Sequence, residues 1–496
     1  MAKEENEQSG FRPPVVTLLG HVDHGKTALL SAIQDRDLSR QEYGGISQHT
    51  RAYQIEQELE EEKRLITFLD TPGHAAFSKM RSRGGKVADL VLLVVAANEG
   101  VEPQTKEAIK YAREADVPII VALNKMDLDT AQPERVNQQL AEEDLTPEDW
   151  GGKITVVPVS AETGEGVDEL VEIILLWAET TELEDTSDEP FQGIVIESHM
   201  DKNRGPMATV LVKQGVVRKG DEITTKQGID EDQGLQKNIN GKVKALLLEG
   251  ENIQKAVPSD PVEILGFEEV PEVGAIVVSG QSEEQIRRGA TRRISTYAPR
   301  DEKTINVILK ADTVGTAQAV EASVEDLTLD EYQVNVVFSG VGGITESDIR
   351  LAYDTNARIF AFNTEQQTGT EGLVSDLKVT IQKYNVIYKL IEGVRNALEQ
   401  RKNKVEGEVK GVGKVIKTFT LPRSGDRVAG TRVILGEIRE GNRIEITRDG
   451  EVEHRARIKN IEEKREDVEK ATKGMEVGIL FYPQFKVKVG DMIEVI

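Results

Sequence analysis

The junction between an apolar run and a glycine-rich loop near the amino terminus sets the strongest limit on the fold. PPVVTLL leads directly into GHVDHGKT at residues 20–27, and KTALLSAIQ continues as a helix-like segment. The loop matches the pattern G-x-x-x-x-G-K-[ST], which carries meaning where a strand precedes it and a helix follows it. Short apolar runs alternate with helix-like segments up to about residue 181, so we predict a doubly wound α/β domain.

The residue types in this loop fit a phosphate group. Gly20 and Gly25 let the backbone curl so that successive amides point at phosphate oxygens. Lys26 can reach the terminal phosphates of a nucleotide, and the Thr27 hydroxyl can ligate Mg²⁺. The dipole of the following helix also faces the anion. The other loop residues that we assign to the nucleotide site are His21, Val22, Asp23 and His24.

A second motif, DTPGH, follows the apolar run RLITFL. Asp70 can hold Mg²⁺ through water, and the Gly73 amide can sense a γ-phosphate. His74 lies one residue beyond that sensor, where GTPases place a glutamine that orients the attacking water. His74 is therefore the catalytic candidate. Three other histidines are predicted to be solvated loop side chains: His21, His24 and His49.

Two further motifs point to a guanine base: NKMD follows PIIVAL, and SAE follows ITVVPVS. The Asp127 carboxylate can accept hydrogen bonds from the N1–H and the 2-amino group of guanine, which adenine does not offer in that arrangement. Asn124 can read the other edge of the base, and the Lys125 stem can lie along the ring. The Ala161 amide, beside Ser160, can donate to guanine O6. Together these motifs specify GTP over ATP.

Charge and composition exclude several classes of protein. The formal charge of −25 over 496 residues argues against broad nonspecific binding to nucleic acid. Residues 401–496 nevertheless hold 21 Lys and Arg against 17 Asp and Glu, so they are the candidate for contact with an RNA backbone. The chain has no cysteine, which excludes disulfides and thiolate metal sites. The longest apolar run, at residues 90–97, is far shorter than the roughly 20 residues that span a bilayer, and the first residues lack the layout of a signal peptide, so we expect a cytoplasmic protein.

After residue 181 the pattern changes to strands and glycine turns, and an internal repeat emerges. QGVVRKGDEITT at residues 214–225 matches LGEIREGNRIEI at residues 435–446 in its glycines and apolar positions, which predicts two related β-barrels. Between them α/β alternation returns; there SGVGGITESD lacks the lysine of a phosphate loop, and Thr345 with Asp348 predicts an ordinary helix start. We therefore predict a multidomain α/β plus β chain with a flexible tail at 1–12, a GTP-binding domain at 13–181, a linker at 182–190, a β-barrel at 191–285, an α/β sandwich domain at 298–384, a connector helix at 385–402 and a second β-barrel at 403–496.

The nucleotide motifs resemble those of translational GTPases, the class that includes elongation factor Tu. Within that class, three longer segments resemble the family of bacterial translation initiation factor two: GGISQHTRAY, LTPEDWGGKITVVPVSAETGEGVDELVE and SGVGGITESDIRLA. The resemblance runs from about Arg12 to the carboxyl terminus, although the extended amino-terminal region of the family is nearly absent.

The resemblance also implies roles for particular residues. His74 would be the catalytic histidine, and Val22 with Ile46 would form an apolar gate that keeps it from the water until the ribosome engages. Ser47 stands where a threonine is usual, and its hydroxyl can still serve the metal. The residues implied to serve phosphate and Mg²⁺ are Lys26, Thr27 and Ser47.

In this family the last barrel holds formylmethionyl initiator tRNA, and the sequence departs from the family there. Thr431 and Val477 stand at positions that usually hold cysteine, and a usual basic stretch aligns with EEKR at residues 462–465. Negative side chains beside RNA weaken phosphate contacts, so recognition of the formyl group stays open. The tRNA-binding candidates are Arg423, Arg427, Thr431, Lys464, Arg465 and Val477.

The residues and the resemblance together predict a ribosome-dependent GTPase of translation initiation. It would place initiator tRNA on the small ribosomal subunit and promote subunit joining, with GTP hydrolysis timing its release. The implied cofactors are GTP or GDP and Mg²⁺. The implied partners are the ribosomal subunits, initiator tRNA and ribosomal RNA near the GTPase site, and we expect a monomer without membrane contact. Two alternatives stay open: an elongation-type GTPase that delivers other aminoacyl-tRNAs, and a GTP-regulated subunit without an RNA partner.

Overall fold

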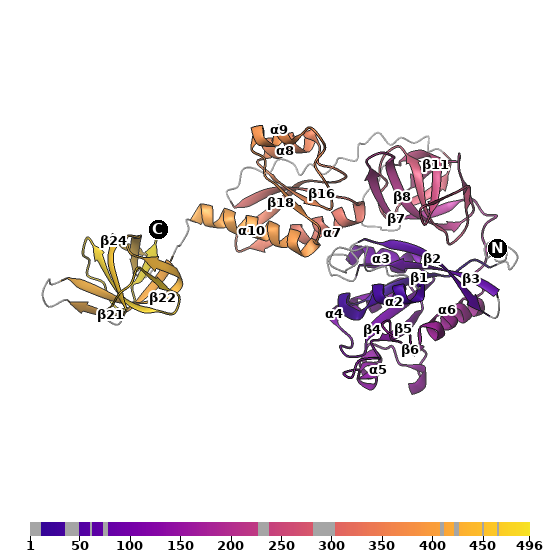
Figure 1. The fold of residues 1–496 in the computed structure, drawn as a ribbon, viewed down its shortest axis with the longest axis horizontal. Helices are drawn as coiled ribbons and strands as arrows, with labels where there is room; N and C mark the ends of the chain where they lie inside the picture. The colour runs from indigo at the N-terminus through magenta and orange to yellow at the C-terminus, as the bar shows by residue number, and fades with distance from the viewer. Residues whose placement is uncertain are drawn as a thin grey trace. The chain divides into compact units, whose positions relative to one another are not determined.

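The chain forms two compact units, which are described separately. A computed structural model (Figure 1) describes residues 11–34, 49–59, 62–72, 78–226, 238–280, 303–406, 411–420, 426–448, 451–463 and 466–496. The second unit is the smaller, and it contains the carboxyl-terminal barrel. The first unit comprises Met1–Arg300, Asn306–Thr328 and Gln333–Arg395, and the second comprises Asp301–Ile305, Leu329–Tyr332 and Asn396–Ile496.

The amino-terminal domain is the doubly wound α/β domain that the sequence predicts. Its six-stranded sheet has the order β2-β3-β1-β4-β5-β6, in which only β2 runs antiparallel to its neighbour. Strands β1 and β4 are buried along their whole length because helices cover both faces of the sheet. The strands are β1 Val15–Gly20, β2 Arg51–Leu59, β3 Glu62–Asp70, β4 Leu90–Ala96, β5 Ile119–Asn124 and β6 Val156–Pro158.

The apolar faces of the helices explain the two layers of core around this sheet. Apolar residues of α2 and α6 pack on one face, and those of α4 and α5 pack on the other. Helix α2 has the bounds that the segment KTALLSAIQ predicts. The helices are η1 Val22–His24, α2 Lys26–Gln34, α3 Ser78–Val87, α4 Pro103–Glu114, α5 Pro133–Glu142, η5 Glu148–Trp150 and α6 Val167–Thr181.

The next segment is a β-barrel, as predicted. Its seven-stranded sheet has the order β10-β15-β7-β8-β14-β11-β12, and β10 also pairs with β11, which closes the barrel. The inward side chains form one apolar core. The strands are β7 Gln192–Asp201, β8 Gly205–Gln214, β9 Val217–Arg218, β10 Glu222–Lys226, β11 Asn240–Leu248, β12 Glu251–Ile253, β13 Lys255–Ala256, β14 Pro261–Phe267 and β15 Ile276–Ser279.

An α/β segment follows, with a five-stranded sheet in the order β17-β18-β16-β19-β20. Thr345 and Asp348 form a capping box at the start of α8, so the predicted helix start in SGVGGITESD is confirmed. The last helix, α10, continues to Glu406, beyond the predicted end of the connector at residue 402. The elements are β16 Thr304–Ala311, α7 Val314–Glu325, β17 Thr328–Leu329, β18 Tyr332–Val341, α8 Glu346–Thr355, β19 Arg358–Phe362, α9 Glu371–Leu377, β20 Ile381–Tyr384 and α10 Ile387–Glu406.

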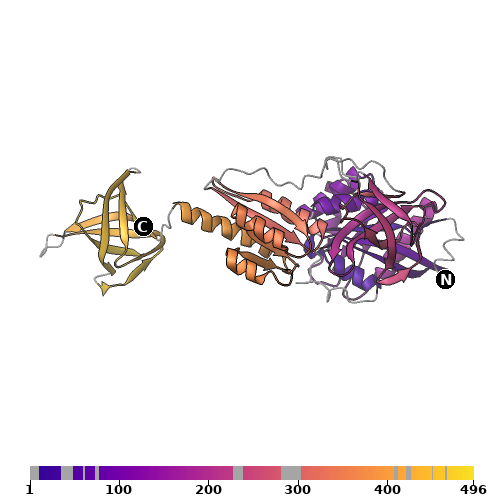
Figure 2. The ribbon, with the colours of Figure 1, turned by 90° about the horizontal axis from the view of Figure 1, so that it is seen from above.

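The carboxyl-terminal segment is a second closed barrel, whose strands, in yellow, wrap around its core in Figure 2. Its sheet runs β21-β28-β23-β24-β27-β22-β26, and β21 also pairs with β22. Among the described residues of the whole chain, no helix is long and apolar enough to cross a membrane. The strands are β21 Gly411–Thr420, β22 Arg427–Arg439, β23 Arg443–Arg448, β24 Glu451–Glu463, β25 Glu466–Asp467, β26 Lys470–Thr472, β27 Glu476–Tyr482 and β28 Met492–Val495.

The repeated sequence folds in the same way in both barrels. The backbone N–H of Arg218 donates to the Asp221 carboxylate at 2.7 Å, and that of Arg439 donates to the Asn442 side chain at 2.7 Å. The glycines that flank each turn have positive φ, which side chains with a Cβ rarely adopt. They are Gly215 and Gly220 in the first barrel, and Gly436 and Gly441 in the second.

Candidate nucleotide site

The nucleotide motifs meet at one edge of the parallel sheet. Gly20 ends β1, Asp70 ends β3 and Asn124 ends β5, while Ser160 follows β6. Parallel strands place their carboxyl ends together, and ligands of open α/β sheets bind at that edge. The sequence motifs, which are far apart along the chain, therefore form a single site.

Packing explains why glycine occupies two positions of the phosphate loop. Gly20 has φ 145°, and a Cβ there would lie 2.3 Å from the Val94 carbonyl oxygen. Gly25 has φ 83°, and a Cβ there would lie 2.6 Å from Nδ2 of Asn124. The buried Lys26 ammonium donates to the carbonyl oxygens of Gly20 at 3.1 Å and His21 at 2.7 Å, so it holds the loop in its curled form.

His24 corrects one sequence prediction, because it is a core residue instead of a solvated loop histidine. Its side chain is 0% exposed, and Nδ1 donates to the Val94 carbonyl oxygen at 3.2 Å. Burial lowers the pKa of His24 to about 4, so the ring is neutral at physiological pH. His21 is half-buried, and its side chain accepts a hydrogen bond from the Asp23 N–H at 3.4 Å. Helix α4 also contacts the loop, because Gln104 accepts a hydrogen bond from the Val22 N–H at 3.2 Å.

Asn124 joins the phosphate loop to the guanine loop. Its side chain is 2% exposed, and Nδ2 donates to the His24 carbonyl oxygen at 3.0 Å. Its Oδ1 accepts from the Ala161 N–H at 3.0 Å, so that amide, predicted to donate to guanine O6, donates here to Asn124. We refer to these two hydrogen bonds as the Asn124 brace. The brace fixes the spacing between the parts that would hold the phosphates and the base.

The other guanine-loop residues are also held by hydrogen bonds. The Ser160 hydroxyl donates to the Asp127 carboxylate at 2.7 Å. The Lys125 ammonium pairs with Oε1 of Glu99 at 2.8 Å. Sequence reasoning missed Glu99. Its position shortly after β4 could have indicated it, because the carboxyl end of β4 lies at the same edge of the sheet as the motifs. Burial would raise the pKa of Glu99, but the hydrogen bond and charge of Lys125 lower it below the ordinary value.

Two of the residues predicted to serve Mg²⁺, Asp70 and Thr27, lie in the part of the chain that the structure describes. Asp70 is 1% exposed at the end of β3, and Leu18 of β1 is its register partner. Thr27 lies in the first turn of α2, which begins where β1 and its loop end. A hydroxyl and a carboxylate suit Mg²⁺, which prefers oxygen ligands. Four predicted residues of the nucleotide site lie outside the described residues: Ile46, Ser47, Gly73 and His74.

The segment that leads into β2 contacts the rest of the first unit, which corrects the prediction for His49. The Nε2 atom of His49 lies 3.0 Å from the carboxylate of Asp312, the residue that follows β16. Burial would lower the pKa of His49, but the hydrogen bond to Asp312 raises it. Nearby, Glu197 of β7 accepts hydrogen bonds from the N–H groups of Ser198 at 2.9 Å and Gly315 at 3.1 Å. Burial raises the pKa of Glu197.

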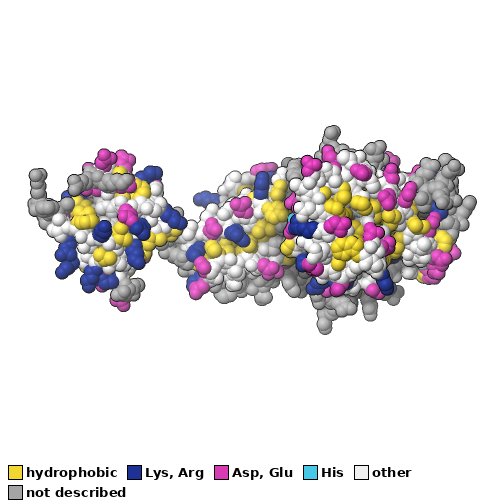
Figure 3. Space-filling model, turned by 90° about the horizontal axis from the view of Figure 1, so that it is seen from below, with side chains coloured by type: hydrophobic (Ala, Val, Ile, Leu, Met, Phe, Trp, Pro, Cys, Tyr) yellow, Lys and Arg dark blue, Asp and Glu magenta, His cyan; other side chains and the backbone are white. Residues whose placement is uncertain are grey.

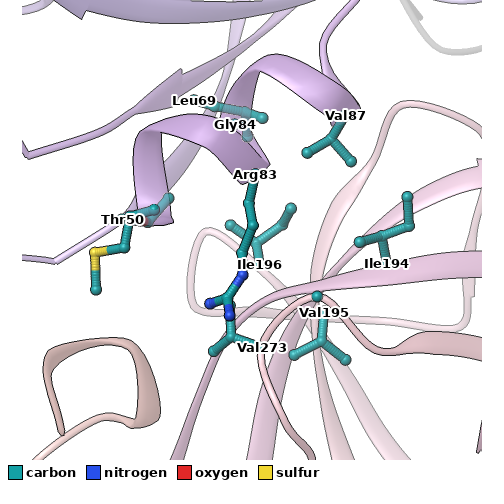
Figure 4. A pocket seen from close by; sticks show the side chains of 11 residues that line it. Thr50, Leu69, Arg83, Gly84, Val87, Ile194, Val195, Ile196 and Val273 are labelled. Atoms are coloured by element: carbon teal, nitrogen blue, oxygen red, sulfur yellow. The ribbon is translucent and has the colours of Figure 1, made fainter. Parts of the chain in front are cut away.

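The amino-terminal domain also packs on the first barrel. The Arg12 guanidinium forms two hydrogen bonds to the Asp89 carboxylate, at 2.6 and 2.7 Å, and Lys213 of β8 lies 3.9 Å from the same carboxylate. Burial would raise the pKa of Asp89, but Arg12 lowers it below the ordinary value. Helix α3 and β7 face each other across a small pocket, into which Arg83 extends toward Val273 (Figure 4).

The predicted tRNA-binding residues that the structure describes in the carboxyl-terminal barrel are buried or half-buried. Thr431 and Val477 are register partners between β22 and β27, and they are 0% and 3% exposed. Their side chains lie in the core, so any effect on RNA would come through the shape of the barrel. Arg427 begins β22 and is half-buried. The structure does not describe Arg423, Lys464 and Arg465. Lys and Arg side chains gather along the lower side of this barrel, at the left of Figure 3.

Comparison with known proteins gives a family. Residues 13–180 match the model of the elongation factor Tu GTP binding domain, 190–280 match elongation factor G domain 2, and 281–395 match translation-initiation factor 2. The structure is similar to a crystal structure of GDP-bound aIF5B from Aeropyrum pernix, with a TM-score of 0.51 and 26% identity, covering 98% of this chain and 92% of that chain.

The curated relatives agree over nearly the whole chain. Translation initiation factor IF-2 of Halothermothrix orenii is 41% identical over 514 residues, which cover 99% of this chain and 73% of that protein. The factor of the same name from a Thermoanaerobacter species is 41% identical over 505 residues, covering 97% of this chain and 71% of that protein. The chain therefore belongs to the translation initiation factor IF-2 family, and it is a translational GTPase that acts in initiation.

Proposed function

We propose that the protein places initiator tRNA on the small ribosomal subunit in the cytoplasm, promotes subunit joining as a monomer, and leaves after hydrolysing GTP. The observation that carries the proposal is the Asn124 brace. It joins a phosphate loop to a guanine loop, as a GTP switch requires. The family assignment favours this function over elongation-type delivery of aminoacyl-tRNA and over a GTP-regulated subunit without an RNA partner.

Mg²⁺ fits the oxygen donors of this site. Thr27, Ser47 and Asp70 would hold the ion, which would neutralise charge on the β- and γ-phosphates. Lys26 would turn from its loop carbonyl acceptors toward the terminal phosphates. The Gly73 amide would sense the γ-phosphate, at the end of the segment that begins with the buried Asp70.

His74 would orient the attacking water. Val22 and Ile46 would keep its ring away until ribosomal RNA draws it in, so hydrolysis would be slow without the ribosome. In other GTPases a single group supplied by a partner raises the rate by about 10³–10⁵, and we expect an effect of that order here.

The experiment compares GTP hydrolysis by the wild type and His74→Ala, with and without ribosomes. We expect the variant to bind GTP normally and to lose nearly all ribosome-stimulated turnover. His199→Ala is the matched control, because His199 lies on β7 of the barrel, outside the nucleotide motifs. Unchanged turnover of His74→Ala on ribosomes would refute the water-orienting role.

A second experiment tests the tRNA partner. The full chain is titrated with methionyl initiator tRNA, with and without the formyl group, at one fixed salt concentration. We expect Arg427→Glu to weaken binding, whereas Arg350→Glu, on the exposed side of α8, serves as the charge-matched control. Equal binding of both tRNAs would mean selection without the formyl group, and no binding of either would favour the function without an RNA partner.

A further inference from the structure

Three metal-ligating side chains converge beside the phosphate loop. His21 and His24 come from the loop after β1, and Glu99 comes from the turn after β4. One ligand atom from each of the three lies within 4.8 Å of the other two. None of the three has been given a role in catalysis or in holding Mg²⁺, so their meeting calls for a separate explanation.

His24 supplies the fixed ligand. Because its Nδ1 donates to the Val94 carbonyl oxygen, Nε2 of the neutral ring carries the lone pair. Nε2 is buried and has no hydrogen-bond partner among the residues that the structure describes. The nearest carboxylate oxygen, Oε2 of Glu99, lies 3.9 Å away, beyond hydrogen-bond distance. A buried acceptor without a partner is costly, so an ion at this position would remove an existing penalty.

His21 and Glu99 can move to complete the set. The His21 ring is half-buried, and its centroid lies 5.1 Å from that of His24. Its hydrogen bond from the Asp23 N–H is long, at 3.4 Å, so the ring can turn at little cost. The Glu99 side chain is 33% exposed, and Lys125 occupies Oε1, which leaves Oε2 to face the histidines. Small side-chain rotations would bring the three atoms to the roughly 2.0–2.2 Å that zinc needs.

We propose that His21, His24 and Glu99 form a binding site for a divalent transition-metal ion, with Zn²⁺ as the best fit. Two imidazoles and one carboxylate are a known zinc ligand set, which leaves a fourth position open to water. Nitrogen ligands disfavour Mg²⁺, so this site differs from the oxygen site at Thr27 and Asp70. Glu99 also holds Lys125 of NKMD, so the ion would tie the phosphate loop to the guanine loop through a second route.

The test is a calorimetric titration of the full, nucleotide-free chain with Zn²⁺ in the presence of excess Mg²⁺. Nucleotide is removed because its phosphates would bind Zn²⁺ themselves. We expect one ion per chain with micromolar affinity or tighter. His21→Ala and Glu99→Gln should each weaken binding by at least about tenfold, because loss of even an outer-shell partner of a metal site costs about 10- to 100-fold in affinity. His199→Ala is the control and should bind as the wild type does.

A Co²⁺ titration gives a second readout of the ligand set. Co²⁺ in a site with imidazole ligands gives visible absorption bands, which both site variants should lose and His199→Ala should keep. Circular dichroism confirms that each variant is folded; Glu99→Gln, the partly exposed and nearly isosteric change, keeps the test valid if His21→Ala unfolds. Absence of a single-ion site in the wild type, or unchanged Zn²⁺ affinity in both variants, would overturn the proposal.

Discussion

Replacing Asn124 by Asp tests whether the brace prepares the site for nucleotide. The aspartate keeps an acceptor for the Ala161 N–H but puts a second oxygen against the His24 carbonyl, in place of the amide donor that lies 3.0 Å away. With Asn124 only 2% exposed, water cannot replace the lost bond. We therefore expect the two loops to separate in the variant.

The size of the effect follows from the burial of the lost bond. Leaving a buried acceptor without its donor costs about 1–3 kcal/mol. If nucleotide binding has to restore the arrangement of the loops, that cost weakens binding by about 5- to 150-fold, since 1.4 kcal/mol is a factor of ten.

The assay is a fluorescence titration with labelled GDP at fixed Mg²⁺ and salt concentrations. Asn442→Asp is the charge-matched control, because Asn442 lies in the carboxyl-terminal barrel and its Oδ1 accepts a hydrogen bond from the Arg439 N–H, which an aspartate can still accept. A dissociation constant within twofold of the wild type for Asn124→Asp would refute the reasoning, since the brace would then contribute nothing to binding.

Three further predictions concern the same unit. Arg12→Ala should lower the free energy of unfolding by about 3 kcal/mol in urea titrations, because it removes the main positive charge paired with the 11%-exposed Asp89 carboxylate. The control Lys63→Ala, in an exposed ion pair, should change that free energy by less than about 0.5 kcal/mol. Folding lowers the pKa of Asp89, so its contribution to stability is present above its unfolded pKa of about 4 and is lost as the pH falls through the lower folded pKa. The wild type should therefore lose more free energy of unfolding than Arg12→Ala on acidification. Equal losses in the two proteins would contradict the assignment. Asp127→Asn should shift nucleotide preference from guanine toward xanthine in competition assays, and retained GTP selectivity would remove the base-reading role.

The sequence predicts those parts of the site that depend on local pattern. A glycine-rich loop between a strand and a helix needs glycines that can adopt positive φ. The roles of Gly20 and Gly25 and the start of α2 at Lys26 could therefore be predicted from the sequence. The capping box at Thr345 follows from residues three positions apart in the same way. The two barrels could be predicted because a repeated turn requires glycine at matching positions.

Contacts between distant segments could not be predicted in this way. The Asn124 brace joins residues 100 positions apart, and the His49–Asp312 contact joins residues 263 positions apart. His24 was expected to be solvated because it lies in a loop. Its burial depends on contact with β4, which is distant in sequence and has no local pattern that links it to the loop. Glu99 gave only a positional signal, and its pairing with Lys125 depends on the order of the strands.

The repeated turn has a consequence for how this protein can change over evolutionary time. The shape of each barrel depends on glycines with positive φ and on a side-chain cap, Asp221 in one and Asn442 in the other. Outward residues elsewhere on the strands are not constrained by that turn geometry. Mutations can therefore alter the charge of a barrel surface, for example at the exposed Glu462 of β24, while the scaffold persists. Ligand preference can therefore change through surface substitutions in such a domain while every successive variant still folds.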